Sequence, residues 1–241
     1  MLVNEKKMEK VKAIKLSYFS DVLCFWAYAA QVRLDELKNK FGKRVEIEHH
    51  FISVFGNTQQ RIGEGWKDRG GYRGFADHVL DAAKSFPQIQ VNPEIWLRSS
   101  PKTSAMSHCF LKAIQLLEKN GVISADINTE FGKTFFEESL WRVRCAFFEG
   151  AQDISNISVL KNIAEELQLP MASIEKSLND GSALAALMSD TEKKELLKLE
   201  GSPSYILNDG RQKLYGNVGY RVIEANVTEL LEHDDNQLSW C

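Results

Sequence analysis

The fold of this chain is decided by the stretch Ser20-Asp21-Val22-Leu23-Cys24-Phe25-Trp26-Ala27-Tyr28, where a strand pattern gives way to a helix pattern. Residues 14–19 mix β-branched, aromatic and alternating side chains, which is typical of a strand. From Trp26 onward the apolar residues recur at helical spacing, so a helix is predicted over 25–41. Cys24 is therefore expected at a helix N-terminus, where free amides and the helix dipole favour a thiolate and lower the thiol pKa below about 8.5.

Cys24 has no partner thiol nearby in the sequence. A Cys-x-x-Cys motif would have its second cysteine three residues later, and this chain has Ala27 there. Cys24 therefore cannot close a local disulfide. The alternative interpretation is a buried cysteine that behaves as a small apolar side chain at a strand end.

The stretch Ser20 to Tyr28 is similar to the active-site turn S-D-x-x-C-P-W-C-Y of the DsbA-like thioredoxin-fold superfamily, particularly its FrnE-like branch. Phe25 replaces the proline of that pattern and Ala27 replaces its resolving cysteine. Far downstream, Gly201-Ser202-Pro203 resembles the strand entry that carries the superfamily's cis-proline opposite the active cysteine. The resemblance implies an α/β thioredoxin-like fold with a large all-helical insertion, and it implies that Ser202 and Pro203 adjoin Cys24.

The pattern along the chain agrees with this layout. Strand 14–19, helix 25–41 and strand 45–52 make a right-handed βαβ unit. Strands 204–207 and 212–215 flank Asn208-Asp209-Gly210, a strong hairpin signal, and helix 220–231 follows. Helical periodicity fills much of the region between the two halves. We therefore predict a discontinuous thioredoxin-like domain of residues 12–56 and 200–233, a helical domain of residues 57–199, and a C-terminal tail of residues 234–241.

Residues 57–90 are harder to interpret because five glycines alternate there with aromatic side chains and arginines. Such loops suit ligand contact. The other interpretation is an irregular connector that buries its aromatic rings against the helical domain, and this is the one we expect.

Charge and composition exclude several classes of function. The 241 residues carry a formal net charge of −3 with both signs interspersed, so neither a nucleic-acid partner nor a membrane surface is expected. No stretch reaches the roughly 18 apolar residues of a membrane span, and no apolar segment follows the basic residues at the N-terminus, so a signal peptide is not expected. We expect a cytoplasmic protein, where glutathione and thioredoxin keep thiols reduced.

A metal site is not expected. The four cysteines, Cys24, Cys109, Cys145 and Cys241, are far apart and lack ligand spacing. Adjacent strand residues point to opposite faces, so His49 and His50 cannot share an ion. One of these histidines is expected to be partly buried and the other to face outward.

A neighbouring branch of the superfamily comprises the kappa-class glutathione transferases and the 2-hydroxychromene-2-carboxylate isomerases, which have serine at the position of Cys24. Gly56-Asn57 is similar to their glutathione-contacting G-N pair, and residues 215–221 are similar to their F-G-x-D-R segment. The agreement is incomplete, because Val218 or Gly219 occupies the aspartate position. The substrate-binding candidates from both resemblances are Phe25, Trp26, Tyr28, Asn57, Ser202, Pro203, Asn217, Gly219 and Arg221.

Three functions follow from these features. The first is a thiol oxidoreductase with Cys24 as its single nucleophile, acting on a small-molecule or cysteinyl thiol through glutathione mixed disulfides. The second is a glutathione-dependent isomerase or transferase acting on a small aromatic or polyketide-like compound. The third is a redox-inactive binding module. Cys241, preceded by Trp240 in the polar tail, is a candidate resolving thiol within one chain or across a homodimer, and the oligomeric state stays open.

Overall fold

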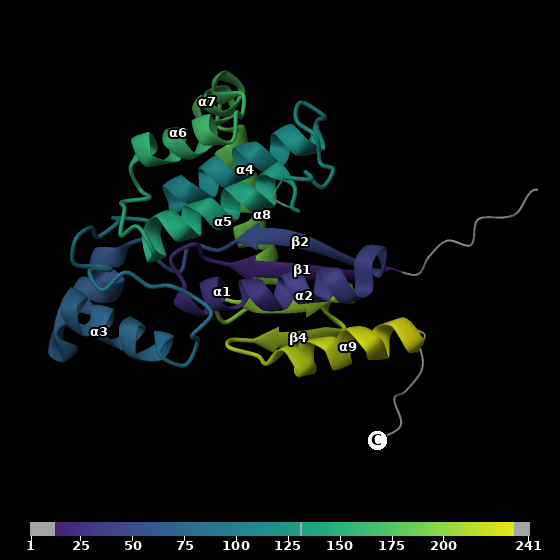
Figure 1. Cartoon of the computed structure of the whole chain (residues 1–241), viewed down its shortest axis with the longest axis horizontal. Helices are drawn as coiled ribbons and strands as arrows, with labels where there is room; N and C mark the ends of the chain where they lie inside the picture. The colour runs from purple at the N-terminus through teal and green to yellow at the C-terminus, as the bar shows by residue number, and fades with distance from the viewer. Residues whose placement is uncertain (1–12, 131, 234–241) are drawn as a thin grey trace, which may run out of the picture.

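The computed structural model describes residues 13–130 and 132–233, and its centre is a four-stranded sheet (Figure 1). The strands are β1 (Ile14–Ser20), β2 (Val45–Phe51), β3 (Ser204–Leu207) and β4 (Gln212–Tyr215). Their order is β2-β1-β3-β4, with β2 parallel to β1 and with β3 antiparallel to both of its neighbours. The mixed sheet thus joins a βαβ unit to a C-terminal hairpin, as the sequence predicted.

One face of the sheet is covered by helices close to it in sequence. These are α1 (Phe25–Ala29), α2 (Gln31–Phe41) and α9 (Tyr220–Glu232). Leu34 and Leu37 of α2 and Val227 of α9 are buried in one apolar cluster with residues of β1, β2 and β3. The single helix expected over 25–41 is interrupted at Ala30, which ends α1 and precedes the first residue of α2.

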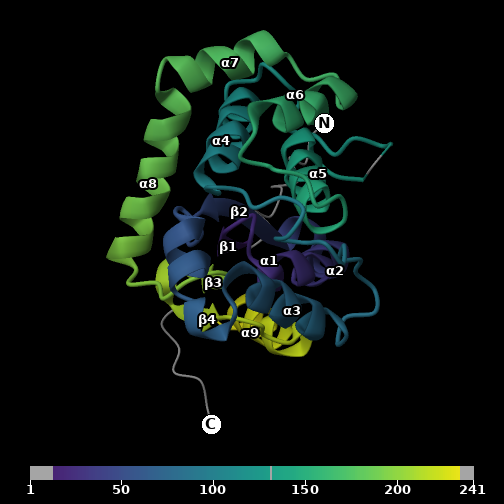
Figure 2. The ribbon, with the colours of Figure 1, turned by 90° about the vertical axis from the view of Figure 1, so that its left-hand side faces the viewer.

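Helices α4 to α8 form a separate layer beyond β2 (Figures 1 and 2). They are α4 (Ala105–Lys119), α5 (Phe135–Phe148), α6 (Ile157–Glu166), α7 (Met171–Asn179) and α8 (Ser182–Leu196). Thr134 fixes the start of α5 through a capping box with Glu137. Figure 2 shows α8 running down the side of the molecule from α7 toward β3. The largest apolar core extends from these helices to the turn around Cys24.

The glycine-rich segment after β2 is more regular than predicted. It contains a π-helical turn, η2 (Gln59–Glu64), a short 3-10 turn, η3 (Lys67–Arg69), and a helix, α3 (Gly71–Ala83). Gly70 has φ +90°, and a Cβ on Gly74 would lie 1.7 Å from the carbonyl oxygen of Arg69. These glycines permit a tight entry into α3. The expectation of an irregular backbone was therefore wrong, whereas the expected burial of aromatic rings is confirmed for Tyr72 and Phe75, which pack against the main core.

The two adjacent histidines of β2 face opposite sides of the sheet, yet both are buried. His49 packs edge-on against Tyr18 and Phe136. His50 stacks on Phe19 and lies 2.7 Å from Asp190 of α8. The expectation that one histidine faces outward was wrong, because α8 covers that side of β2.

Candidate functional site

Cys24 lies at the junction between β1 and α1, where it is the N-cap residue of the helix. The Sγ atom of Cys24 donates a hydrogen bond to the backbone carbonyl oxygen of Ser202, at 3.3 Å. The peptide bond between Ser202 and Pro203 is cis. The structure therefore brings the turn around Cys24 and the Ser202-Pro203 segment, the two matches of the sequence resemblance, into contact. Cys24 is buried there, with 6% of its surface exposed.

A cleft of about 280 Å³ opens beside this sulfur. The turn and the loop before β3 contribute Cys24, Phe25, Trp26, Glu200, Gly201 and Ser202, and β4 contributes Tyr215. The segment after β2 contributes Val54, Phe55, Arg61, Phe75, His78, Val79 and Ala82. Five of the fourteen lining residues, Arg61 and four residues of α3, thus come from the glycine-rich region. The lining combines apolar and aromatic side chains with charged and hydroxyl groups, and concave sites of this kind can bind a small molecule.

The pKa of the Cys24 thiol is raised, contrary to the expectation from the helix N-terminus. Burial is the largest cause, and the negative charge of Asp21 acts in the same direction. Hydrogen bonds to the Ser202 side chain and to the amides of Ala27 and Trp26 lower this pKa, but by less. The prediction was wrong because α1 has only five residues and because the tertiary structure removes the sulfur from water.

Asp21 holds the turn in place from inside the protein. Its Oδ1 atom accepts the amide of Leu23 at 2.9 Å, and Oδ2 accepts the amide of Phe55 and the hydroxyl of Ser104, each at 2.8 Å. Its own amide donates to the Ser202 hydroxyl at 2.9 Å. Burial raises the pKa of Asp21 to about 6, although these hydrogen bonds oppose the change. One carboxylate thus connects the turn to the loop after β2 and to the start of α4.

His108 of α4 supports the same turn. Its Nε2 atom accepts the amide of Val22 at 3.2 Å, so this nitrogen carries no proton. Its ring stacks on Phe51, and burial lowers the pKa of His108 to about 3. His108 is therefore neutral near pH 7 and acts as a rigid support for the turn.

Only some of the substrate-binding residues predicted from the sequence lie at the cleft beside Cys24. Phe25, Trp26 and Ser202 line the cleft with Cys24, and Pro203 is buried directly after Ser202. Outside the lining are Tyr28, Asn57, Asn217, Gly219 and Arg221.

Each of the residues outside the lining has another position. The Tyr28 hydroxyl donates to Glu149 at 2.8 Å, and Asn57 accepts the amide of Gln60. Asn217, Gly219 and Arg221 follow β4, around the start of α9. The C-terminal candidates, Cys241 and Trp240, lie outside the described residues, so a resolving role for Cys241 stays a prediction.

Sequence reasoning missed the charged residues of the cleft. Arg61 and Glu200 come from segments that have no motif, and only the glycine-rich and aromatic composition around Arg61 pointed to ligand contact.

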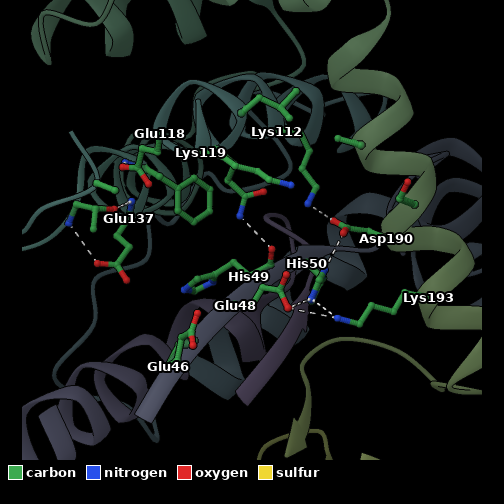
Figure 3. A pocket seen from close by; sticks show the side chains of 18 of the residues that line it. Glu46, Glu48, His49, His50, Lys112, Glu118, Lys119, Glu137, Asp190 and Lys193 are labelled. Carbon is green, nitrogen blue, oxygen red and sulfur yellow. Dashed lines mark hydrogen bonds and ion pairs between the residues drawn. The ribbon is translucent and has the colours of Figure 1, made fainter. Parts of the chain in front are cut away.

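A second hollow, of about 730 Å³, lies between β2 and helices α4 and α8 (Figure 3). Figure 3 shows Lys112 from α4 and Asp190 from α8 meeting above His50 of β2. Asp190 accepts from Lys112 at 2.6 Å, from the Phe51 amide at 2.7 Å and pairs with His50 at 2.7 Å. These buried groups satisfy one another and join the helical layer to the sheet. No cysteine lines this hollow in the described part of the chain.

Within residues 13–130 and 132–233, no helix is long and apolar enough to cross a membrane. The same residues contain no group of three or more histidine, cysteine, aspartate or glutamate side chains placed to hold a metal ion.

Comparison with known proteins supports the fold. No protein-family model and no curated protein sequence matches this chain. Among solved structures, it is similar to a probable DsbA oxidoreductase from Streptomyces coelicolor, with a TM-score of 0.68 and 16% identity over 95% of this chain and 94% of that one. It is also similar to the cytosolic disulfide reductase DsbM from Pseudomonas aeruginosa, with a TM-score of 0.64 and 20% identity over 90% and 99%.

A third similar structure is a 2-hydroxychromene-2-carboxylate isomerase, with a TM-score of 0.57 and 16% identity over 90% of this chain and 95% of that one. The DsbM protein has also been solved with GSH. The chain therefore has a DsbA-like thioredoxin fold, as the resemblance at the Cys24 turn predicted.

Proposed function

We propose that this protein is a thiol oxidoreductase that uses Cys24 as its single nucleophile and works through mixed disulfides with glutathione. The observation that carries the proposal is the position of Cys24. Its sulfur faces Ser202 in a cleft, and it is the one sulfur among the described residues that lines that cleft. Cys109 and Cys145 are on helices α4 and α5 of the other layer.

The proposed reaction is a pair of thiol–disulfide exchanges. The Cys24 thiolate attacks the glutathione sulfur of a glutathionylated thiol, so a bond from Cys24 to glutathione forms and the other thiol leaves as a thiolate that takes up a proton. A second glutathione thiolate then attacks the adduct on Cys24. This step releases oxidised glutathione and regenerates the Cys24 thiolate, so the net reaction converts one glutathione mixed disulfide and one reduced glutathione into the free thiol and oxidised glutathione.

Because residue 27 is alanine, the second step of this route requires a thiol from outside the turn. The Ala27 amide donates a hydrogen bond to the backbone carbonyl oxygen of Cys24, at 3.1 Å, but the methyl side chain of Ala27 offers no thiol to resolve the adduct. The reduced thiol must then come from outside the turn, and a reducing compartment such as the cytosol supplies it. The GSH complex of DsbM, a protein of similar fold, agrees with a glutathione partner. We propose small-molecule or cysteinyl thiols as substrates.

The test compares wild type with Cys24→Ser in turnover of a glutathione mixed disulfide, coupled to oxidation of reduced glutathione. We expect the variant to lose all activity, since serine cannot form the adduct. Cys109→Ser, which changes a thiol outside the cleft, is the matched control and is expected to keep wild-type activity. Equal turnover by wild type and Cys24→Ser would contradict the proposal.

A glutathione-dependent isomerase is the second candidate, and the aromatic lining of the cleft favours it. Phe25, Trp26, Phe55 and Phe75 surround a space suited to a small aromatic ring. The similar fold of a 2-hydroxychromene-2-carboxylate isomerase is consistent with this candidate. Isomerisation of a chromene carboxylate with reduced glutathione, retained in Cys24→Ser, would favour the isomerase. A protein inactive in both assays would instead fit a redox-inactive binding module.

A further inference from the structure

The cleft beside Cys24 contains charged side chains that thiol–disulfide exchange does not itself require. Arg61, from η2, and Glu200, from the loop before β3, both line it. Both are exposed at its surface. Their opposite charges give the cleft a polarity that its apolar residues cannot provide.

Arg61 is held in place without a carboxylate partner. Its guanidinium carbon lies 5.0 Å from the centre of the Phe55 ring, which is itself buried. Such stacking orients the planar group while leaving its N–H donors available. Arg61 forms no ion pair with any residue in the described part of the chain. A guanidinium held in this way binds a carboxylate with two parallel hydrogen bonds.

Glu200 provides a carboxylate in the same cleft, with no basic partner among the residues that the structure describes. It precedes Gly201 and Ser202, so it is two residues from the carbonyl that faces Cys24. Among residues 13–130 and 132–233, no lysine, arginine or histidine pairs with it. The carboxylate of Glu200 is therefore available to accept hydrogen bonds from an ammonium group.

The size of the cleft restricts the ligand. At about 280 Å³ it is slightly below the usual range of roughly 300 to 1,000 Å³ for drug-sized ligands. A bound group must also place a sulfur atom against Cys24, in a cleft whose lining includes the apolar rings of Phe25 and Phe55. These conditions suit one short, charged arm of a disulfide.

We propose that the cleft selects small thiols and disulfides of the amino-acid and short-peptide class, whose carboxylate binds Arg61 and whose ammonium group binds Glu200. This inference rests on the proposed function, because it concerns the substrate of Cys24. During attack, the bound half forms the new disulfide with Cys24, and the other half leaves as a thiolate and takes up a proton. Arg61 and Glu200 take no part in the bond changes and act by holding the charged groups of the bound half.

The experiment measures the rate of mixed-disulfide formation on Cys24, by intact mass, with disulfides that differ in charge. Two of them carry one kind of charge: 3,3′-dithiodipropionic acid has only carboxylates and cystamine has only ammonium groups. Oxidised glutathione has both kinds of charge, and bis(2-hydroxyethyl) disulfide is neutral. Arg61→Gln is expected to slow the dithiodipropionate and glutathione reactions about fivefold at low salt, and to leave the neutral reaction unchanged. Glu200→Gln is expected to slow the cystamine and glutathione reactions by a similar factor.

Arg69→Gln is the matched control, since Arg69 stacks on Trp66 at 3.8 Å and does not line the cleft. We expect it to change none of the rates. Charge selection is wrong if Arg61→Gln slows every disulfide equally, which would indicate a structural role, or slows none. If Cys24 reacts equally with all four disulfides, the proposed function stands and this inference fails. If Cys24 reacts with none of them, both fail.

Discussion

The Sγ atom of Cys24 lies 3.3 Å from the backbone carbonyl oxygen of Ser202, 178 residues later in the chain. A carbonyl oxygen can accept a hydrogen bond from a thiol but repels a thiolate, so this contact favours the protonated form of Cys24. The amides of Ala27 and Trp26 favour the ionised form. The reactivity of Cys24 depends on this competition and on burial.

Alkylation of Cys24 by iodoacetamide is expected to have a midpoint above the pKa of an unhindered cysteine, about 8.5. Burial raises the Cys24 pKa, so a smaller fraction of the sulfur is thiolate at pH 7. Peptide mapping after timed labelling from pH 6 to pH 10 gives this midpoint, with an unstructured cysteinyl peptide as the control. A rate that is already maximal at pH 7 would show that the amides outweigh burial.

Asp21→Asn is expected to change how stability depends on pH between 4 and 7. Asp21 has a pKa of about 6 when folded and about 3.9 when unfolded, so the folded protein binds more protons in this interval. The contribution of this group to wild-type stability therefore rises by about 2 kcal/mol as the pH falls from 7 to 4. Urea unfolding of both proteins across this interval measures the difference. Asp77→Asn, at an exposed position of α3, is the control, and parallel curves for wild type and Asp21→Asn would contradict the expectation.

Asp190→Ala is expected to lower the free energy of unfolding by about 3 to 5 kcal/mol. The change leaves the buried Lys112 ammonium and His50 without their carboxylate, and the Phe51 amide without an acceptor. Glu192→Ala, at an exposed position of the same helix, should change stability by no more than about 0.5 kcal/mol. Equal urea midpoints for the two variants would show that the contacts of Asp190 with Lys112, His50 and Phe51 do not stabilise the fold.

Ala27→Cys is expected to convert the turn into a dithiol site. Residue 27 is buried next to the Cys24 sulfur, so a thiol there can attack an adduct on Cys24. Mild oxidation should form a disulfide between residues 24 and 27, and insulin reduction should exceed that of wild type. Ala27→Ser has a similar size without a thiol and should behave like wild type. A long-lived glutathione adduct in Ala27→Cys would contradict the prediction.

The sequence predicted those features that depend on local pattern. The alternation in β1, the Asn208-Asp209-Gly210 hairpin and the turn around Cys24 each have a signal within a few residues. The interruption at Ala30 has no such signal, since alanine is a good helix former. Helix α3 was missed because its glycines weaken a helical pattern, although Gly74 is required by contact with Arg69.

The candidate site was predicted less completely because tertiary packing determines it. The helix dipole argument for Cys24 used only neighbouring residues, while burial by distant segments controls its pKa. Arg61 and Glu200 belong to segments 139 residues apart that meet only in the folded chain. The similarity of residues 56–57 and 215–221 to motifs of glutathione transferases also pointed to Asn57 and Arg221, which lie outside the lining of the cleft.

The most direct test of the central claim is the mass of the protein after incubation with oxidised glutathione, followed by peptide mapping. The account predicts one glutathionyl group, located on Cys24 and removed by reduced glutathione, and no adduct at that position in Cys24→Ser. A protein whose mass is unchanged, or whose adduct lies on Cys109 or Cys145 while Cys24 stays free, would contradict the claim that Cys24 is the nucleophile.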